Sequence, residues 1–259
     1  SLIKDKLTAK GYARLQNAVV TFLNGTTLKG DFTSPCLSLV ASGENIQGRG
    51  NAAVHNFFLK WPANYELQGQ LTLEDMNFNY TPSSAWKIES RLTANQIDIQ
   101  LPGGHHFTSD AVAPIVVHFD PSARTAAVEA NGNLTKSALK LNKGITITDE
   151  PAARVHVEWN GNQDPSTNYS GSVVFKNAAL MGAYFGPVEY IQGTAQFKNN
   201  WMQSDRLSFQ ALGMPASLKG ALNDFPSAGV DVKIHVDAFD LKAAPKLIPK
   251  FFTDNQLNL

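Results

Sequence analysis

Residues 230–236 read Val-Asp-Val-Lys-Ile-His-Val, so an apolar side chain stands at every second position. A period of two is typical of a β-strand with one apolar face and one polar face. The same alternation occurs in residues 65–73, 115–119 and 155–159. Strands buried on both faces, as in parallel α/β sheets, would instead read as continuous apolar runs, which this sequence lacks. The alternation predicts an all-β protein with antiparallel sheets and argues against nucleotide-binding α/β folds.

Turn sequences separate the alternating runs. Examples are Asn24-Gly25, Pro102-Gly103-Gly104, Asn131-Gly132 and Asn160-Gly161-Asn162. Their spacing predicts about fourteen to sixteen strands of ordinary length, roughly 5–6 residues each. Helix is expected only as one or two short turns between Asp240 and Phe252, where Pro245 and Pro249 interrupt the helical spacing, and as a weaker candidate at 35–40.

One run changes its parity in the middle. Leu71 and Leu73 are odd-numbered, whereas Met76, Phe78 and Tyr80 are even-numbered. A shift of one residue would turn the second set to the wrong face of the sheet. We therefore predict a β-bulge near Asp75, since one extra residue restores the facing of both sets.

A degenerate repeat runs through the chain. Its copies begin with glycine and carry Asn or Asp six positions later, and they are Gly11 to Asn17, Gly69 to Asp75 and Gly171 to Asn177. A second motif closes a short strand with glycine, at Gly30, Gly193 and Gly220. Glycine weakens a strand unless it marks a bend, a bulge or a close approach, so each copy is expected to bend there. We predict one continuous β-rich unit over 1–259, built of degenerate repeats at about 1–64, 65–168 and 169–259.

Composition excludes several classes of protein. The 259 residues include 22 Lys and Arg and 22 Asp and Glu, giving a net charge of +0, and only 17% of residues are charged. A neutral chain without a basic run is a poor nucleic-acid binder. The single cysteine, Cys36, excludes an internal disulfide and a multi-cysteine zinc site. No apolar run reaches the roughly 18 residues of a membrane helix. Because the chain opens at Ser1 in mid-pattern, we expect it to be a piece of a longer protein.

Five motifs follow one another in the last third of the chain. They are Gly171-Ser-Val-Val-Phe-Lys-Asn177-Ala178, Gly186-Pro-Val-Glu-Tyr-Ile-Gln-Gly193 with Phe197, Leu207-Ser-Phe209, Ala216-Ser-Leu218-Lys-Gly220, and Val230 to Val236 followed by Phe239-Asp240-Leu241. This order resembles the repeat unit of the AsmA-like family, the AsmA/TamB/YhdP type of Gram-negative envelope protein. Residues 65–135 resemble a more diverged copy, so the resemblance extends over about two-thirds of the chain.

The resemblance implies a fold, a place and a function. The fold would be a long, curved antiparallel sheet that forms an open, barrel-like groove, or β-taco, with an apolar concave side. The place would be the periplasm, with the full-length protein anchored in the inner membrane by a helix outside this sequence. The function would be that of a non-enzymatic bridge that carries phospholipid, or another acyl-chain lipid, between the inner and outer membranes.

The residues themselves are compatible with lipid binding. Each buried methylene contributes about 0.8 kcal/mol, so an acyl chain of about sixteen carbons could gain on the order of 10 kcal/mol before ordering costs. Alternation leaves a second arrangement open, in which another sheet closes a sandwich that binds carbohydrate or protein through loops such as 102–107. The expected groove-lining residues occupy apolar positions of the runs, and they are Leu71, Leu73, Ile97, Ile99, Val117, Phe119, Val155, Val157, Val173, Phe175, Phe197, Leu207, Phe209, Val232 and Ile234.

No constellation of residues signals catalysis. His105 and His106 are adjacent, so on a strand they point to opposite faces and suit a shared metal poorly. Asp231 and Asp237 fall on the polar face of their run, and we expect Cys36 to be a small, buried apolar residue instead of a nucleophile. The sequence contains neither a Gly-x-Ser-x-Gly elbow nor a glycine-rich phosphate loop. We expect a protein that is not an enzyme and that uses no cofactor and no metal.

Overall fold

The computed structural model describes residues 6–236 apart from 22–24, 62–64, 82–83, 102–103, 142–143, 161–165, 183–184, 200, 212 and 224–228. The described residues form no α-helix. In this part of the chain, therefore, no helix is long and apolar enough to cross a membrane. The helical turns predicted between residues 240 and 252 lie outside the described residues.

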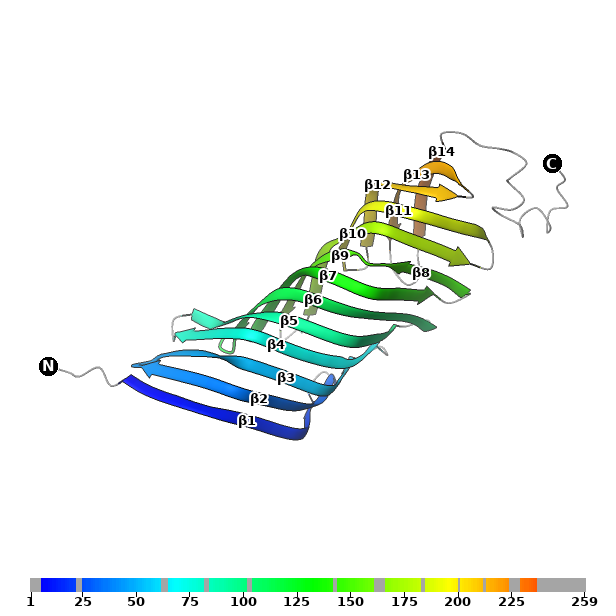
Figure 1. Ribbon diagram of the computed structural model, residues 1–259. Helices are drawn as coiled ribbons and strands as arrows, with labels where there is room; N and C mark the ends of the chain where they lie inside the picture. Colours follow the sequence, from blue (N-terminus) through cyan, green and yellow to red (C-terminus); the bar gives the residue numbers. More distant parts are fainter. Residues whose placement is uncertain are drawn as a thin grey trace, which may run out of the picture. The chain divides into compact units, whose positions relative to one another are not determined.

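Fourteen strands within the described residues form one sheet (Figure 1). Thirteen follow the order β1 to β8 and then β10 to β14, while β9 pairs with β7 and β10. Each pair of strands whose register is described is antiparallel, which confirms the predicted all-β, antiparallel class and the number of strands. The strands are β1 (Lys6–Thr21), β2 (Thr27–Ser42), β3 (Asn45–Trp61), β4 (Tyr65–Thr81), β5 (Ser84–Leu101), β6 (His105–Asp120), β7 (Thr125–Leu141), β8 (Ile145–Asp149), β9 (Ala152–Asn160), β10 (Ser166–Gly182), β11 (Phe185–Lys198), β12 (Trp201–Ala211), β13 (Met214–Asn223) and β14 (Gly229–Val236).

The chain divides into two compact units. Unit 1 consists of Ser1–Ile99, Asp110–Asn133 and Arg154–Tyr169, and it contains the whole of β1 to β4. Unit 2 consists of Gln100–Ser109, Leu134–Ala153 and Ser170–Leu259, and it contains the whole of β11 to β14. The three repeats predicted at about 1–64, 65–168 and 169–259 stay a prediction.

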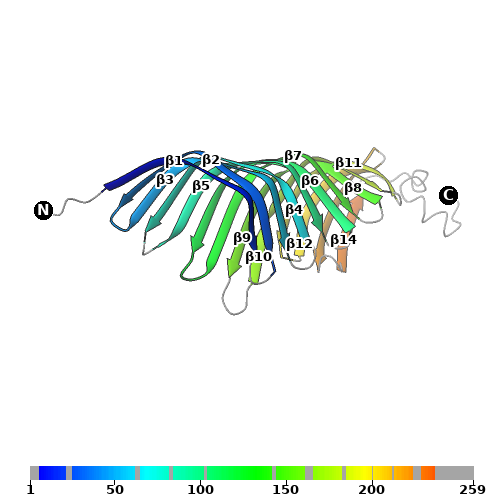
Figure 2. The ribbon, with the colours of Figure 1, turned by 90° about the horizontal axis from the view of Figure 1, so that it is seen from below.

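The strands are longer than predicted. Strands β1 to β7 each have 16 to 18 residues, instead of the ordinary 5–6. The reason is that bulges reset the alternation, so one long strand reads as two short ones. Strand β4, for example, contains both the run at 65–73 and the run at 76–80. Bulges also bend a strand, and Figure 2 shows β1 and β2 bending along their length.

The bulge predicted near Asp75 is confirmed. Leu73 pairs with Ala52 and Met76 pairs with Gly50, so two residues of β4 oppose the single Asn51 of β3. Asp75 has a φ of 51°, and its backbone N–H donates to Asn51 Oδ1 at 3.0 Å. Residues paired across a ladder share a face, so the leucines before the bulge and the aromatic residues after it lie on the same side of the sheet.

The Asn or Asp of the repeat motif marks a bulge in each copy. Asn17 has a φ of 53° and, with Gln16, opposes Asp31 of β2. The register between β10 and β11 is interrupted between Phe175 and Ala178, which brackets Asn177. Asn and Asp tolerate the left-handed conformation better than other non-glycine residues, which explains their place in the motif.

Carboxylates on neighbouring strands hold these bulges. Asp31 Oδ1 accepts the Asn17 N–H at 2.8 Å, and Asp31 Oδ2 accepts the Asn56 side-chain amide at 2.8 Å. Asp110 Oδ1 accepts the Gln96 N–H at 2.8 Å. In unit 2, Asp149 accepts the N–H groups of Lys176 and Asn177 at 3.3 Å each. A bulge leaves backbone groups outside the ladder, and these carboxylates supply the missing acceptors.

Asp31→Asn should lower stability at neutral pH and have no effect in strong acid. The pKa of Asp31 lies below its ordinary value of 3.8, because the Asn17 N–H and then the Asn56 amide donate to the carboxylate. A lowered pKa means that the carboxylate stabilises the fold above pH 3.8 and that this contribution is lost as the pH falls through the lowered pKa. Urea midpoints of both proteins, measured from neutral pH into acid, check this expectation. A gap that stays constant with pH would contradict it.

Two sequence predictions of local structure are wrong. The candidate helix at 35–40 lies inside β2, where Pro35 sits in a register interruption against both β1 and β3. Proline has no N–H, so a bulge is where a strand can accept it. The predicted turn at Asn131-Gly132 lies inside β7. A Cβ atom at Gly132 would come within 2.5 Å of the Ala113 Cβ, so this glycine serves a close approach between strands.

Strands β8 and β9 occupy one position in the sheet. Both pair with β7 and β10, and residues 150–151 separate them. Pro151 cannot donate to a ladder, but its carbonyl oxygen accepts the Leu134 N–H at 2.9 Å. The proline therefore interrupts the strand without ending its pairing.

Candidate functional site

One face of β1 to β4 in unit 1 is apolar. The register aligns Leu15, Phe32, Val54 and Leu71 in a row across the four strands. A second row aligns Val20, Leu28, Leu59 and Leu67. Because the bulges lie between these rows without changing their facing, the apolar side chains stay together; we call this surface the unit-1 apolar face.

The opposite face of the same strands is polar. One row across it consists of Lys10, Ser38, Arg49 and Asn77. Asp31 and Gln70 occupy the same face farther along the strands. Each directly precedes a residue of an apolar row, Phe32 and Leu71, and neighbouring residues of a strand point to opposite faces. In these rows of β1 to β4 the register separates polar from apolar side chains.

Unit 2 repeats this separation. The register aligns Phe175, Gly193, Leu207, Leu218 and Ile234 in one row across β10 to β14. The adjacent row consists of Gln192, Ser208, Ser217 and His235 from β11 to β14, and it is polar. We call the surface that carries the first row the unit-2 apolar face.

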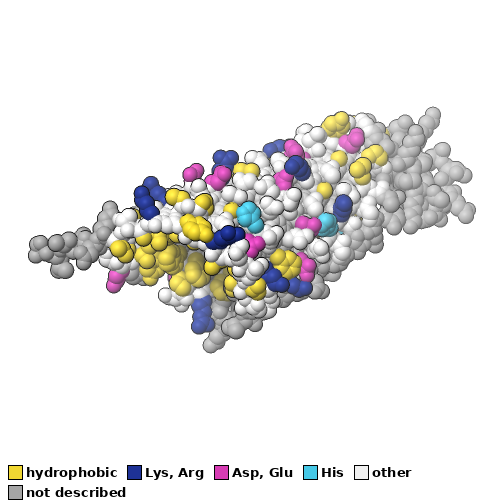
Figure 3. Space-filling view, turned by 60° about the horizontal axis from the view of Figure 1, so that its bottom comes forward, with side chains coloured by type: hydrophobic (Ala, Val, Ile, Leu, Met, Phe, Trp, Pro, Cys, Tyr) yellow, Lys and Arg dark blue, Asp and Glu magenta, His cyan; other side chains and the backbone are white. Residues whose placement is uncertain are grey.

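The apolar faces are not packed as a core. Apart from Pro151, the buried hydrophobic residues among those described are alanines, at positions 52, 94, 113, 178, 195, 211 and 216. The largest fully buried side chain in the same residues is that of Ser34. Leu15 is 59% exposed, and Leu7 is 69% exposed. Figure 3 shows hydrophobic side chains gathered on the surface toward the β1 end of unit 1. A fully packed core would bury leucine and phenylalanine first, so the described residues do not cover these faces completely.

Small residues are buried where the bulges crowd the strands. Ser34 donates from Oγ to the carbonyl oxygen of Asn51 at 2.7 Å, and Ser90 donates to that of Glu74 at 2.8 Å. Both carbonyls belong to the bulge between β3 and β4. Ser204 donates in the same way to Thr194 in unit 2, at 2.7 Å. A serine there satisfies a backbone oxygen that the ladder leaves free, and a larger side chain would not fit.

The predicted lining residues divide between the two units. Unit 1 contains those of β4, β5, β6 and β9, and unit 2 contains those of β10 to β14. Leu71 and Leu73 lie on the unit-1 apolar face. The half-buried side chains are those of Leu71, Leu73, Ile97, Ile99, Val117, Val155, Val157, Val173, Phe175, Phe197, Leu207 and Phe209. Phe119 is 41% exposed. For Val232 and Ile234 the structure gives the register positions, opposite Gly220 and Leu218.

An aromatic group extends the unit-1 apolar face. Tyr80 stacks on Trp86 with ring centroids 4.6 Å apart, and Phe78 lies 6.2 Å from the same ring. The Phe78 ring occupies the space over Gly48, where a Cβ atom would overlap it. Phe78, Tyr80 and Trp86 are all half-buried.

Two tyrosines of unit 1 come from strands far apart in the sheet order. Partial burial raises the pKa of Tyr169 in β10, and the nearby phenol of Tyr65 in β4 raises it further. An electrostatic effect between these side chains requires that the first residues of β4 and the β10 end within unit 1 approach each other. Tyr169 is 39% exposed, and Tyr65 is half-buried.

The described part of the chain contains several contacts between charged side chains. No group of three or more His, Cys, Asp or Glu side chains in this part of the protein could hold a metal ion. His156 contacts Glu158 at 3.0 Å and Glu129 at 3.6 Å, and all three are exposed or half-exposed. His105 and His106 open β6 in unit 2, whereas His118 belongs to unit 1. Cys36 is exposed, in contrast to the buried residue expected from the sequence.

Sequence reasoning missed one group of residues on the polar face of unit 1. Phe58, Gln68, Gln70, Gln96 and Asp98 come together around a hollow over β3, β4 and β5. Only the cross-strand register brings these residues together, so no motif marked them.

Comparisons of the chain with protein-family models, with curated proteins and with solved structures found no match.

Proposed function

We propose that this protein is a non-enzymatic lipid-binding and lipid-transfer segment that holds the acyl chains of phospholipids against its apolar faces. The observation that carries the proposal is the incomplete burial of these faces: rows of apolar residues, interrupted only by Gly193, span four and five strands, none of their described large side chains is buried, and Leu15 and Val20 of β1 are exposed. Covering them with an acyl chain gains about 0.8 kcal/mol for each buried methylene. Such binding needs shape and apolar area instead of fixed hydrogen-bond partners.

In the proposed arrangement the apolar faces are the concave side of a curved groove, a β-taco, with short helical turns near the C-terminus. Long strands that bend at bulges support this curvature. The effect of Tyr65 on the pKa of Tyr169 supports it within unit 1, because strands distant in a sheet approach each other only if the sheet curls. Acyl chains would then lie inside, and the polar rows would face water.

The cellular setting follows from the resemblance to the AsmA-like family. We place the segment in the periplasm, in a protein that an inner-membrane helix anchors outside this sequence and that bridges the inner and outer membranes. The nearly uncharged apolar rows support a role in passing lipids along a surface, since they offer no fixed polar group that would hold one headgroup. In this proposal the chain has no catalytic residue, cofactor or metal.

The alternative is a closed β-sandwich that binds carbohydrate or protein through its loops. A filled sandwich core buries its large side chains, as packed protein interiors do. None of the large apolar side chains described is buried, and this observation favours the lipid-binding arrangement over a sandwich.

Lipid extraction of the purified protein tests the proposal. Native mass spectrometry should detect phospholipid-sized adducts, and organic extraction should remove and identify them. The delipidated protein should then take up a fluorescent phospholipid from solution with a blue shift in its emission, because the dye enters an apolar site. Protein that carries no lipid, and that does not change the emission of the dye, would overturn the proposal.

A further inference from the structure

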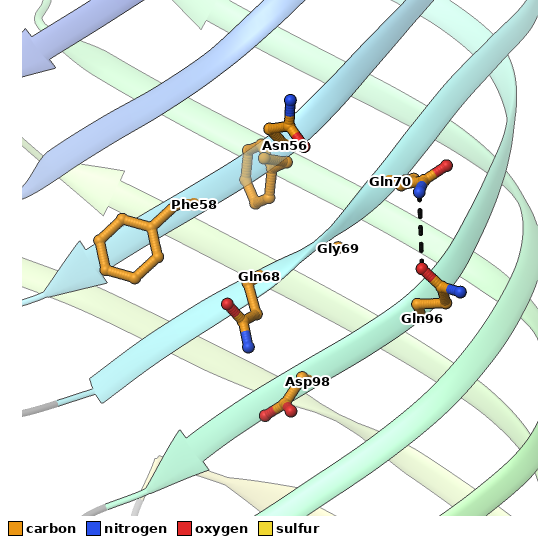
Figure 4. Close-up of a pocket in the computed structure, with 8 residues that line it drawn as sticks. Asn56, Phe58, Gln68, Gly69, Gln70, Gln96 and Asp98 are labelled. Carbon is orange, nitrogen blue, oxygen red and sulfur yellow. Dashed lines mark hydrogen bonds between the residues drawn. The ribbon is translucent and has the colours of Figure 1, made fainter.

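A second candidate site lies on the polar face of unit 1, on the other side of the sheet from the apolar face. It is an open hollow with a volume of about 440 Å³ over β3, β4 and β5. The residues that line it are Asn56, Phe57, Phe58, Gln68, Gly69, Gln70, Gln96 and Asp98 (Figure 4). Its size falls within the usual range for small-molecule sites, roughly 300–1,000 Å³.

Two rows of side chains make the walls. Phe58 and Gln68 are cross-strand partners, and Asp98 follows on β5, so ring, amide and carboxylate line one wall. Gln70 and Gln96 line the other wall, with the Gln70 Nε2 3.5 Å from the Gln96 Oε1. Gly69 lies between the rows, and a Cβ atom there would come within 3.2 to 3.5 Å of the β5 backbone at Asn95, Gln96 and Ile97.

Bulges hold the walls in place from outside. Asn56 and Gln96 both have positive φ, at 52° and 55°. The Asn56 amide donates to Asp31, and the Gln96 N–H donates to Asp110, each at 2.8 Å. Neither carboxylate lines the hollow, so they fix the walls without occupying the site. A site whose walls are ordered in advance loses less entropy when a ligand binds.

The chemistry of the walls selects a class of ligand. Side-chain amides both donate and accept hydrogen bonds, and a carboxylate accepts two at once, which matches adjacent hydroxyl groups. The Phe58 ring offers an apolar surface for the C–H face of a sugar ring. None of the lining residues is Lys or Arg. Lys29 is outside the lining, and its Nζ lies over the Phe58 ring at 5.8 Å from the ring centroid. The Asp98 carboxylate disfavours an anion.

We propose that this hollow binds a neutral saccharide. The amides of Gln68, Gln70 and Gln96 and the carboxylate of Asp98 bind the hydroxyl groups, and Phe58 stacks on the ring. The site is independent of the proposed lipid binding, because it occupies the polar face of the sheet. Either proposal can therefore fail without the other.

Titration of the isotope-labelled protein with glucose, galactose and N-acetylglucosamine, each alone, tests the proposal by nuclear magnetic resonance. We expect at least one sugar to shift the side-chain amide signals of Gln68, Gln70 and Gln96 with millimolar affinity. Asp98→Asn and Gln68→Ala should each weaken the affinity by about tenfold, the loss expected for one hydrogen bond to a charged or polar group. Asp98→Asn keeps the size of the side chain, so it should preserve the fold.

Gln47→Ala is the matched control, since Gln47 is exposed on the same face of β3 and lies outside the hollow. It should leave the affinity unchanged. Amide signals that no sugar moves, or an affinity that falls equally in Gln47→Ala, would overturn the proposal. Shifts produced by glycerol 3-phosphate instead of the sugars would also overturn it, since they would identify an anion site.

Discussion

The double substitution Leu71→Asp/Leu73→Asp should reduce the lipid bound by the purified protein by at least about tenfold. Both side chains lie on the unit-1 apolar face and are half-buried. Two carboxylates placed against an acyl chain lose their hydration without gaining partners, which costs several kcal/mol, and each 1.4 kcal/mol corresponds to about tenfold in affinity. Native mass spectrometry of the variant, compared with the wild type, measures the loss.

The control uses the neighbouring residues of the same strand. Gln70→Asp/Thr72→Asp introduces the same charge on the polar face of β4, where the register places both side chains. This variant should retain its lipid, and urea unfolding should show that both variants are folded. Equal loss of lipid in the two variants would mean that charge or stability, instead of the apolar face, decides binding.

Gly50→Ala should destabilise the protein by about 2–3 kcal/mol, near the upper end of the cost of overpacking. Gly50 pairs with Leu37 and Met76 beside the bulge at Asn51. A methyl group there would overlap the carbonyl oxygen of Cys36, which is backbone and cannot rotate away. The strands would have to separate at a point where the ladder already lacks one pair. The change in urea midpoint at constant m-value measures the cost.

Gly11→Ala provides the comparison. Gly11 lies in β1, and a Cβ atom there would meet nothing within 4 Å. The substitution should be neutral, or stabilise by about 0.4–1 kcal/mol through the entropy of the unfolded chain. Equal midpoints for the two alanine variants would refute the close approach described at Gly50.

Alternation predicted the class of fold and the faces of the strands. The parity change between Leu73 and Met76 was enough to locate a bulge, because an apolar face must stay continuous. Strand length could not be predicted in the same way. A bulge interrupts the period, and from sequence alone its two halves look like separate strands joined by a turn. The turn predicted at Gly132 was wrong for a related reason. In a sequence, a glycine that allows two strands to approach closely looks the same as a turn glycine.

The sequence could not predict how completely the apolar faces are covered. Leu71 would alternate with its polar neighbours equally well under a second sheet or under a lipid. The hollow around Gln68 and Asp98 was hidden for another reason. Its residues lie on three strands, so they become neighbours only once register and bulges fix the pairing. The carboxylate of Asp31 likewise had no sequence signature, because its partners lie 14 and 25 residues away.

The burial of small residues has a consequence for how this sheet can change over time. In most domains the large interior side chains are close-packed, so a substitution that changes their volume is costly. Here the most buried positions are Ala178, Ser34 and Ala52, at 0%, 1% and 2% exposure, whereas no described leucine or valine is buried. The large residues can be exchanged for one another freely as long as they remain apolar. Selection would then conserve mainly the alanines, serines and glycines at the buried positions. Two relatives could therefore share this architecture with little sequence similarity.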